Sequence, residues 1–317
     1  MTGTVHQPVL LAETLDGLRV KPGGRYLDAT LGGGGHTRAL LEASAPDGLV
    51  LGLDRDAAAL ARTGAALAGY AGRLRTAHGN YAEMAALSAA AGLSEFDGIL
   101  MDLGVSSDQL DTPERGFSFL RDGPLDMRMD ATRGQTAAEW LAGAEEAEIA
   151  RVIYELGEER MSRRIARAIV RQRAEAPLER TLDLAALVER AVGGRKGARL
   201  HPATRTFQAL RMQVNGELPG MEAGVEAAIA LLKPGGRLAV ITFHSLEDRW
   251  VKHCFREHEG REESLYTGGS VWRGRLPRVV RVTRKPVVAS EAEQAENPRA
   301  RSAKLRVIEK MESDLNP

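Results

Sequence analysis

The first third of the chain alternates between short apolar runs and segments with helical periodicity. The apolar runs predict strands, and the segments between them predict helices. The strands are expected at 25–30, 49–54, 73–76 and 97–102, and the helices at 36–43, 56–69 and 81–91. Strands that alternate with helices in this way are typical of a parallel sheet with helices on both faces. The sequence therefore predicts an α/β fold with an open sheet over this region.

The alternation stops after residue 102. A loop rich in glycine and charged residues covers 104–134, and three or four helical patterns follow before the next apolar run at 236–243. The first of these patterns begins after Thr136-Ala137-Ala138-Glu139, a capping-box sequence that predicts a helix start. The turn Lys233-Pro234-Gly235-Gly236 is typical of a connection from a helix to a strand. We therefore predict that a helical domain is inserted after the fourth strand.

The predicted insert covers residues 111–207, and residues 1–110 and 208–317 form a discontinuous sheet domain around it. After the last parallel strand we expect a helix through residue 256 and then a loop to about residue 276. Two further strand candidates, 278–284 and 303–308, would form an antiparallel hairpin at the sheet edge.

Arginines recur with helical spacing along one segment of the predicted insert. One stripe of this helix carries Arg160, Arg164, Arg167 and Arg171, while the apolar positions 161, 165, 168 and 169 occupy another stripe. Such a stripe can bind the phosphates of a nucleic acid. Acidic residues lie nearby at positions 155, 158 and 159, so an ordinary solvated face is an equal alternative at this point.

The composition narrows the choice of partners. The chain has 317 residues with 43 basic and 43 acidic side chains, so no overall charge attracts it to nucleic acid, and any basic site must be local. No apolar stretch approaches the roughly 18 residues that would span a bilayer, so we expect a cytoplasmic protein without a membrane partner. The single cysteine, Cys254, cannot form an internal disulfide and has no zinc-binding spacing, so we predict no metal site.

A glycine run between the first strand and the first helix indicates a cofactor loop. Gly32 to Gly35 have no Cβ, so the backbone can approach a ligand closely just before the helix start at His36. Asp54 ends the second strand about 20 residues further on, where a carboxylate typically accepts the hydroxyls of a ribose. A dinucleotide is disfavoured, because Thr37 stands where the third glycine of the fingerprint would be. The alternative to a cofactor site is that the glycines form an exposed turn and that Asp54 only caps the helix that follows.

Three predicted strands end in an acidic residue. In an open α/β sheet the carboxyl ends of the strands share one crevice, so Asp28, Asp54 and Asp102 should converge there. Each could instead cap the helix that follows its strand. Asp102 occupies the position where amino-directed methyltransferases place a short polar residue that receives the target amine, although the usual tail of two prolines and an aromatic residue is missing.

Several segments then resemble one family. They are Leu103-Gly104-Val105-Ser106-Ser107-Asp108-Gln109-Leu110-Asp111, Arg115-Gly116-Phe117-Ser118-Phe119, the segment 122–130, His201-Pro202-Ala203-Thr204-Arg205, the segment 243–249 and Glu296-Asn297-Pro298-Arg299. Together these segments, in this order, resemble the RsmH (MraW) family of ribosomal RNA small-subunit methyltransferases. The resemblance extends over nearly the whole chain.

This resemblance implies methylation, dependent on S-adenosylmethionine, of the N4 amino group of one cytidine in the decoding region of 16S rRNA, within the small ribosomal subunit. It also implies a Rossmann-like methyltransferase sheet with an inserted helical domain. The cofactor site carried over from the family motifs consists of Gly34, Gly35, His36, Asp54, Tyr81, Asp102 and Gln109. We assign RNA binding to Arg164, Arg167 and Arg171, and the sequence leaves a homodimer open.

Asp102 is the predicted catalytic residue. The lone pair of a cytosine amine is delocalised into the ring, so an acceptor must hold its N–H groups and turn the nitrogen towards the methyl group. His36 is expected to offer its backbone N–H to the cofactor rather than to act as a base, and the role of His244 stays open. Phe117 and Phe119 could stack on a displaced cytosine or anchor their loop to the core.

Three other functions compete with this interpretation. Methylation at C5 of cytosine needs a thiolate nucleophile, but Cys254 falls on a predicted helix away from the crevice. A nicotinamide oxidoreductase would share the cofactor loop but would not explain the motifs of residues 103–130. A non-catalytic ribosome-assembly factor could keep the cofactor pocket and bind RNA through the insert. The intact loop and Asp102 favour an enzyme over the last of these.

Overall fold

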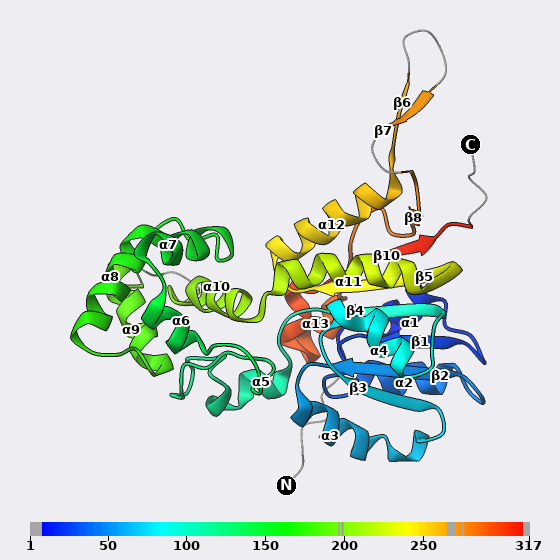
Figure 1. Cartoon of the computed structure of the whole chain (residues 1–317), viewed down its shortest axis with the longest axis horizontal. Helices are drawn as coiled ribbons and strands as arrows, with labels where there is room; N and C mark the ends of the chain where they lie inside the picture. Colours follow the sequence, from blue (N-terminus) through cyan, green and yellow to red (C-terminus); the bar gives the residue numbers. More distant parts are fainter. Residues whose placement is uncertain (1–7, 196, 198–199, 265–269, 274–275, 313–317) are drawn as a thin grey trace. The chain divides into compact units, whose positions relative to one another are not determined.

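The chain folds into two compact units. In this computed structural model the described residues are 8–195, 197, 200–264, 270–273 and 276–312. The first unit is built from both ends of the chain, up to Gly104 and from Pro219 onward, and the second runs from Val105 to Leu218 (Figure 1). The second unit is longer than the predicted insert of 111–207, because Val105, Leu110 and Leu210 pack into its core.

The first unit contains one large sheet with the strand order β3-β2-β1-β4-β5-β10-β8, and β9 also pairs with β10. Its strands are β1 (Arg25–Asp28), β2 (Leu49–Asp54), β3 (Leu74–His78), β4 (Phe96–Asp102), β5 (Leu232–Thr242), β8 (Val279–Arg281), β9 (Val287–Val288) and β10 (Lys304–Lys310). Neighbours among β1 to β5 are parallel, whereas β10 is antiparallel to β5, β8 and β9. The predicted α/β fold with an antiparallel edge is therefore confirmed.

The helices of the first unit connect these strands, except for the first helix, which precedes β1. They are α1 (Leu11–Leu18), α2 (Gly35–Ala43), α3 (Ala57–Ala66), α4 (Met84–Ala90), α11 (Glu217–Leu231), α12 (Ser245–Glu259) and α13 (Glu291–Glu296). The chain runs outward from β1 to β3 and then returns to β4 and β5, so right-handed crossovers place the connecting helices on opposite faces. This reversal between β1 and β4 is where open α/β sheets bind their ligands.

Two segments of the first unit depart from the sequence prediction. The predicted loop to about residue 276 contains a two-stranded antiparallel ribbon, β6 (Arg261–Ser264) and β7 (Ser270–Arg273). Each of these strands has four residues, which is too short a run for the alternation of apolar and polar residues that predicts a half-buried strand. The predicted turn at 233–236 lies inside β5, where the pairing with β4 shifts register between Phe96 and Gly98. Gly235 has a φ of +74° there, which explains the turn-like sequence within a strand.

The second unit is helical. Its helices are α5 (Ser107–Asp111), α6 (Ala137–Gly143), α7 (Glu146–Glu155), α8 (Ser162–Glu175), α9 (Thr181–Val192) and α10 (Thr204–Asn215). The capping box at Thr136 and Glu139 is present at the start of α6, as predicted. The helices are more numerous than the three or four expected patterns, because a short turn at Ala144 and Glu145 separates α6 from α7, and Gly216, with a φ of +57°, ends α10.

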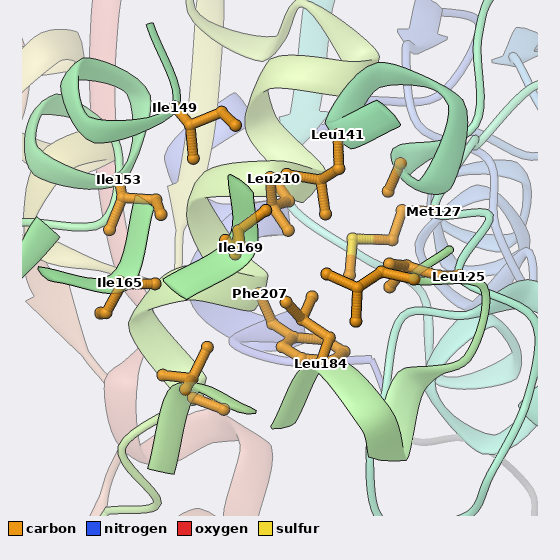
Figure 2. Close-up of a cluster of buried hydrophobic side chains, with 14 of the residues drawn as sticks. Leu125, Met127, Leu141, Ile149, Ile153, Ile165, Ile169, Leu184, Phe207 and Leu210 are labelled. Carbon is orange, nitrogen blue, oxygen red and sulfur yellow. The ribbon is translucent and has the colours of Figure 1, made fainter. Parts of the chain in front are cut away.

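Aliphatic side chains from these helices form the core of the second unit (Figure 2). Ile149 and Ile153 of α7, Ile165 and Ile169 of α8, and Leu210 of α10 are all fully buried. The apolar stripe predicted for α8 is thus the stripe that packs. The helix nevertheless begins at Ser162, so the expectation that Arg160 lies on it is wrong. Glu159 accepts the Met161 N–H at 2.8 Å and holds the preceding turn out of the helix.

Candidate cofactor and catalytic site

The glycine loop between β1 and α2 depends on two glycines with positive φ. Gly32 has a φ of +48° and Gly34 a φ of +76°, which side chains rarely adopt. A Cβ at Gly34 would also lie 2.4 Å from Cγ2 of Thr63 on α3. At Gly33, in contrast, a Cβ would meet no heavy atom within 4 Å among the described residues. One side of the loop is therefore packed on α3, and the side at Gly33 leaves space for a ligand.

Asp54, at the end of β2, holds this loop in place. Its Oδ2 accepts a hydrogen bond from the Gly32 N–H at 2.7 Å, and its Oδ1 accepts one from the Asp56 N–H at 2.8 Å. Burial raises the pKa of Asp54 and the nearby charges of Asp56 and Asp28 raise it further, whereas these two hydrogen bonds oppose the shift. The structure places Asp54 beside the loop, and its contact with a ribose stays a prediction.

A hydrogen-bonded chain links the ends of β1 and β4. Asp28 is buried, and its Oδ2 accepts a hydrogen bond from Oγ1 of Thr37 at 2.7 Å, while its Oδ1 accepts the Thr30 N–H at 3.1 Å. Thr30 Oγ1 in turn accepts the backbone N–H of Asp102 at 2.7 Å. Sequence reasoning missed both threonines, because their polar role depends on which strands are neighbours. Through Thr30, the predicted catalytic residue is tied to the strand that carries the glycine loop.

Asp102 combines partial exposure with an unpaired oxygen. Its side chain is 26% exposed, yet its Oδ1 is buried and has no hydrogen-bond partner among the described residues. Its Oδ2 lies 3.6 Å from Nδ1 of His36. Burial raises the pKa of Asp102 well above its usual value, and the carboxylates of Asp28 and Glu247 act in the same direction. An unpaired buried acceptor is costly, so it calls for a donor that arrives with a ligand.

His36 is the second residue of α2, and its ring is buried. Its Nε2 lies 3.1 Å from the carbonyl oxygen of Val9, just before α1. Pro8 packs against the same helix start, because a Cβ at Gly35 would lie 3.0 Å from its ring. The first N–H groups of any helix have no partner within the helix, so the predicted backbone role of Gly35 and His36 fits this position. The contact of the His36 side chain with Asp102 was not predicted.

Tyr81 begins a short 3-10 turn after β3 and is mostly buried. Its ring lies against α11, since a Cβ added at Gly224 would come within 2.8 Å of Cδ2 of Tyr81. The glycine lets the helix approach the ring closely. An aromatic wall is therefore present at the end of β3, and its contact with adenine stays a prediction.

His244 caps the helix that follows β5. Its Nδ1 accepts the Glu247 N–H at 3.4 Å, and its Nε2 lies 2.9 Å from Oε1 of Glu247. Oε2 of Glu247 accepts the backbone N–H of Phe243 at 2.8 Å. The structure thus gives His244 a capping contact at the start of α12, and whether it also takes part in catalysis stays open.

The family loop of residues 103–130 lies almost entirely in the second unit, and Gln109 lies there with it. Gln109 is buried in α5, where its Oε1 accepts the Ser106 N–H at 3.0 Å in a capping box. Asn215 of α10 fixes the other end of the loop, because it accepts the Met129 N–H at 2.8 Å and donates to the Met127 carbonyl at 2.7 Å. The cofactor contact of Gln109 stays a prediction.

The two loop phenylalanines differ. Phe117 is buried in the core of the second unit, which is the anchoring alternative. Phe119 is partly buried, and its ring centroid lies 4.7 Å from that of His201 and 4.7 Å from that of Phe207, with the latter pair edge to face. These ring contacts fix the loop on α10.

The predicted RNA-binding arginines lie on the solvent face of α8. Arg164, Arg167 and Arg171 are all exposed, and Arg167 lies 3.9 Å from Glu146 of α7. Arg173 on the same helix differs, because its Nη1 donates to the carbonyls of Leu141 and Ala144 at the end of α6. The three predicted arginines therefore form an accessible basic face, while Arg173 is a structural residue.

Cys254 is buried on α12. Burial raises the pKa of its thiol to about 12, and the carboxylates of Glu222, Glu257 and Glu226 contribute to the shift. Such a thiol is not ionised near neutral pH and is a poor nucleophile. Within the described residues, no helix is long and apolar enough to cross a membrane, and no group of three or more His, Cys, Asp or Glu is arranged to hold a metal ion.

Comparison with known proteins identifies close relatives. The sequence profile described as the MraW methylase family matches residues 3–311. Ribosomal RNA small subunit methyltransferase H from Geobacter sulfurreducens is 52% identical to the chain over 96% of its length and 99% of the relative. The protein of the same name from Syntrophotalea carbinolica is also 52% identical, over 96% of the chain and 98% of the relative. Among solved structures, an rRNA methylase from Streptococcus thermophilus aligns over 98% of this chain and 100% of its own, with 10% identity and a TM-score of 0.43.

Proposed function

Because the chain belongs to the MraW methylase family, we propose that it transfers a methyl group from S-adenosylmethionine to the N4 amino group of a cytidine in the decoding region of 16S rRNA. The resemblance to this family that the sequence carries is thereby confirmed. Relatives with half of their residues in common with the chain are named as methyltransferases of small-subunit ribosomal RNA. We infer that the RNA is presented within the small subunit, in the cytoplasm.

The residues around the glycine loop suit this cofactor. Gly33 leaves room for close approach, the first turn of α2 offers backbone N–H groups at Gly35 and His36, and Asp54 stands beside the loop. Bound S-adenosylmethionine supplies a methyl group on a sulfonium, which is strongly electrophilic. The protein therefore has to hold and orient the reactants rather than activate the methyl group.

The single observation that supports amine methylation most directly is the unpaired Oδ1 of Asp102. This oxygen can accept an N–H of the cytosine amine and turn the nitrogen lone pair out of conjugation with the ring. As the nitrogen–carbon bond forms, the sulfur–carbon bond breaks and its electrons stay on sulfur. The amine then gives up one proton, for which Asp102 is the adjacent acceptor. The exposed arginines of α8 supply the local positive charge that a neutral chain needs to hold RNA.

Mass-spectrometric mapping of small-subunit RNA tests the function. RNA from cells that lack the protein should have an unmodified cytidine at one decoding-region position, and the purified protein should restore N4-methylcytidine there. A protein with Asp102→Ala should bind the small subunit without restoring the mark. Restoration of 5-methylcytidine, or full occupancy of N4-methylcytidine without the protein, would refute the proposal. Growth rescue by the Asp102→Ala protein without any methylation would favour a non-catalytic assembly factor.

A further inference from the structure

The ring of His36 bridges the N-terminal segment and Asp102. On one side Nε2 lies 3.1 Å from the Val9 carbonyl oxygen, and on the other Nδ1 lies 3.6 Å from Oδ2 of Asp102. The ring is buried, at 6% exposure, so it has little freedom to turn away. Oδ2 thus faces a basic side chain while Oδ1 is left for the substrate.

The contact with Val9 determines where the protons of His36 are. A carbonyl oxygen only accepts hydrogen bonds, so Nε2 must carry a hydrogen. Nδ1 then faces Oδ2 either as a bare lone pair or as the N–H of an imidazolium. Two bare acceptors facing each other repel, so one proton is favoured between Nδ1 and Oδ2. The distance of 3.6 Å is slightly long for a hydrogen bond, but such contacts commonly shorten when the reactants bind.

The surroundings of this pair are acidic. Asp28 of β1 and Glu247 of α12 both disfavour a negative charge on Asp102, and Asp54 of β2 adds its charge next to Asp28. His244 lies 2.9 Å from Glu247. Among the described residues, His36 is the one basic side chain within ion-pair distance of Asp102. A neutral Asp102 would have one oxygen committed as a donor and would hold the amine less well.

We propose that His36 is a positioning residue for Asp102: its ring, fixed by Val9, holds Oδ2 and favours the ionised form of the carboxylate, so that Oδ1 can accept the amine of the substrate cytosine. This inference rests on the proposed function of Asp102 and extends it. The transfer step itself is unchanged. The methyl group is transferred from the sulfonium to the amine nitrogen, and the amine proton passes to the Asp102 carboxylate. The contact with His36 affects how readily this carboxylate is ionised before transfer.

Two variants separate the contacts of the ring. His36→Gln can keep the hydrogen bond to the Val9 carbonyl but presents nothing to Oδ2, whereas His36→Asn can place an N–H near Oδ2 without a charge. His78→Gln is the matched control, because Nε2 of His78 also lies 3.0 Å from a carbonyl oxygen, that of Arg55, in the same unit. Calorimetry gives the cofactor affinity of each protein, so that all assays can be run at saturating cofactor, and His78→Gln should bind the cofactor as the wild type does.

The first measurement does not depend on activity. Carbon-13 NMR of labelled aspartate in the free protein, assigned with Asp102→Asn, follows the ionisation of Asp102 directly. Loss of the imidazolium that this proposal places beside Oδ2 should move that titration to higher pH by about one unit or more in both His36 variants. The His78→Gln protein should titrate as the wild type does. An unchanged Asp102 titration in folded His36→Gln protein would overturn the inference.

The second measurement is the pH dependence of single-turnover methyl transfer at saturating cofactor. Since Asp102 must be ionised to accept the amine, transfer should fail as the pH falls, and this acid limb should move to higher pH by the same amount in His36→Gln. His36→Asn should share the shifted limb but recover more of the rate at high pH. An acid limb identical to the wild type would overturn the inference, whereas a wild-type protein that forms no N4-methylcytidine would refute the proposed function instead.

Discussion

The carboxyl edge of the sheet and the arginine face of α8 represent two kinds of functional surface. At the sheet edge, Asp28 and Asp54 accept specific hydrogen bonds of 2.7–3.1 Å, whereas Oδ1 of Asp102 is buried and has no hydrogen-bond partner among the described residues. On α8 the arginines are exposed, and the contact of Arg167 with Glu146 joins side chains that are 78% and 45% exposed. Removal of a single well-placed atom can abolish the function of a preorganised site. The affinity of a charged face for nucleic acid instead depends on how many charges it carries.

Removal of Asp102 should therefore have the largest effect. Asp102→Ala deletes the oxygen that orients the amine, and single-turnover transfer should fall by about 10²-fold or more, which is typical for a positioned polar group. Asp102→Asn is the control, because it keeps an acceptor oxygen but adds an N–H group and loses the charge. Rapid-quench measurement of N4-methylcytidine at saturating cofactor checks this, and full activity in the alanine variant would remove Asp102 from the mechanism.

Loss of Asp54 should weaken cofactor binding. Hydrogen bonds to a charged group contribute about 1.5–3 kcal/mol each, so Asp54→Ala should raise the dissociation constant of S-adenosylmethionine roughly tenfold or more for each ribose bond lost. The N–H groups of Gly32 and Asp56 also lose their acceptor, so the loop itself should loosen. Calorimetry with the cofactor measures the effect. Wild-type affinity in the folded variant, or a preference of the wild type for NAD, would contradict the cofactor site.

The arginine face should respond in a graded way. If Arg164, Arg167 and Arg171 each neutralise one phosphate, replacing all three by Gln should reduce the salt dependence of log affinity by about 2, at roughly 0.7 per contact with single-stranded RNA. Titration of the small subunit across several salt concentrations gives this slope. Cofactor binding should be retained. The three side chains are not part of the hydrophobic core of the second unit, so their replacement should leave the fold intact.

A control with two other arginines tests whether this result is specific, with the change in salt slope compared per charge removed. Arg133 and Arg151 are exposed arginines of the same unit that do not belong to α8 and that pair with Asp130 and Glu155. Their replacement by Gln should leave the salt slope nearly unchanged. If both sets of changes reduce the slope equally, the contact is diffuse. If neither does, the α8 face is only solvated, and the RNA contact should be sought in the segment of Arg299 and Arg301.

The same contrast explains what the sequence could predict. The strands β1, β2 and β4 follow from their apolar runs, although the predicted first strand extended two residues beyond Asp28. Their acids Asp28, Asp54 and Asp102 lie at one edge, because strand ends share one edge in any parallel sheet. The ribbon of β6 and β7 was missed, since each of its strands has only four residues and such short runs give no clear periodic signal.

Contacts between distant segments were beyond the reach of the sequence. His36 stands next to the glycine run, but its contact with Asp102 exists only because β1 and β4 are neighbours. The tie between Thr30 and Asp102 has the same origin. At Arg160 the sequence predicted too much rather than too little, because periodicity alone extended the predicted helix beyond the true start of α8 at Ser162. The spacing of apolar residues predicts which residues lie on the same helix or strand. The site depends in addition on which helices and strands are neighbours in the fold.

The smallest expected effect is at Cys254, and it decides between two chemistries. Methylation at C5 of cytosine would need its thiolate to attack the ring, so replacing it would abolish turnover. In the structure the thiol is buried on α12, and its pKa of about 12 keeps it protonated at neutral pH. Cys254→Ala should therefore leave the rate of N4-methylcytidine formation roughly unchanged, with a modest loss of stability from the missing sulfur. Nucleoside analysis after single turnover checks both rate and product. Complete loss of transfer in a folded Cys254→Ala protein would move the chemistry away from Asp102 and the sheet edge.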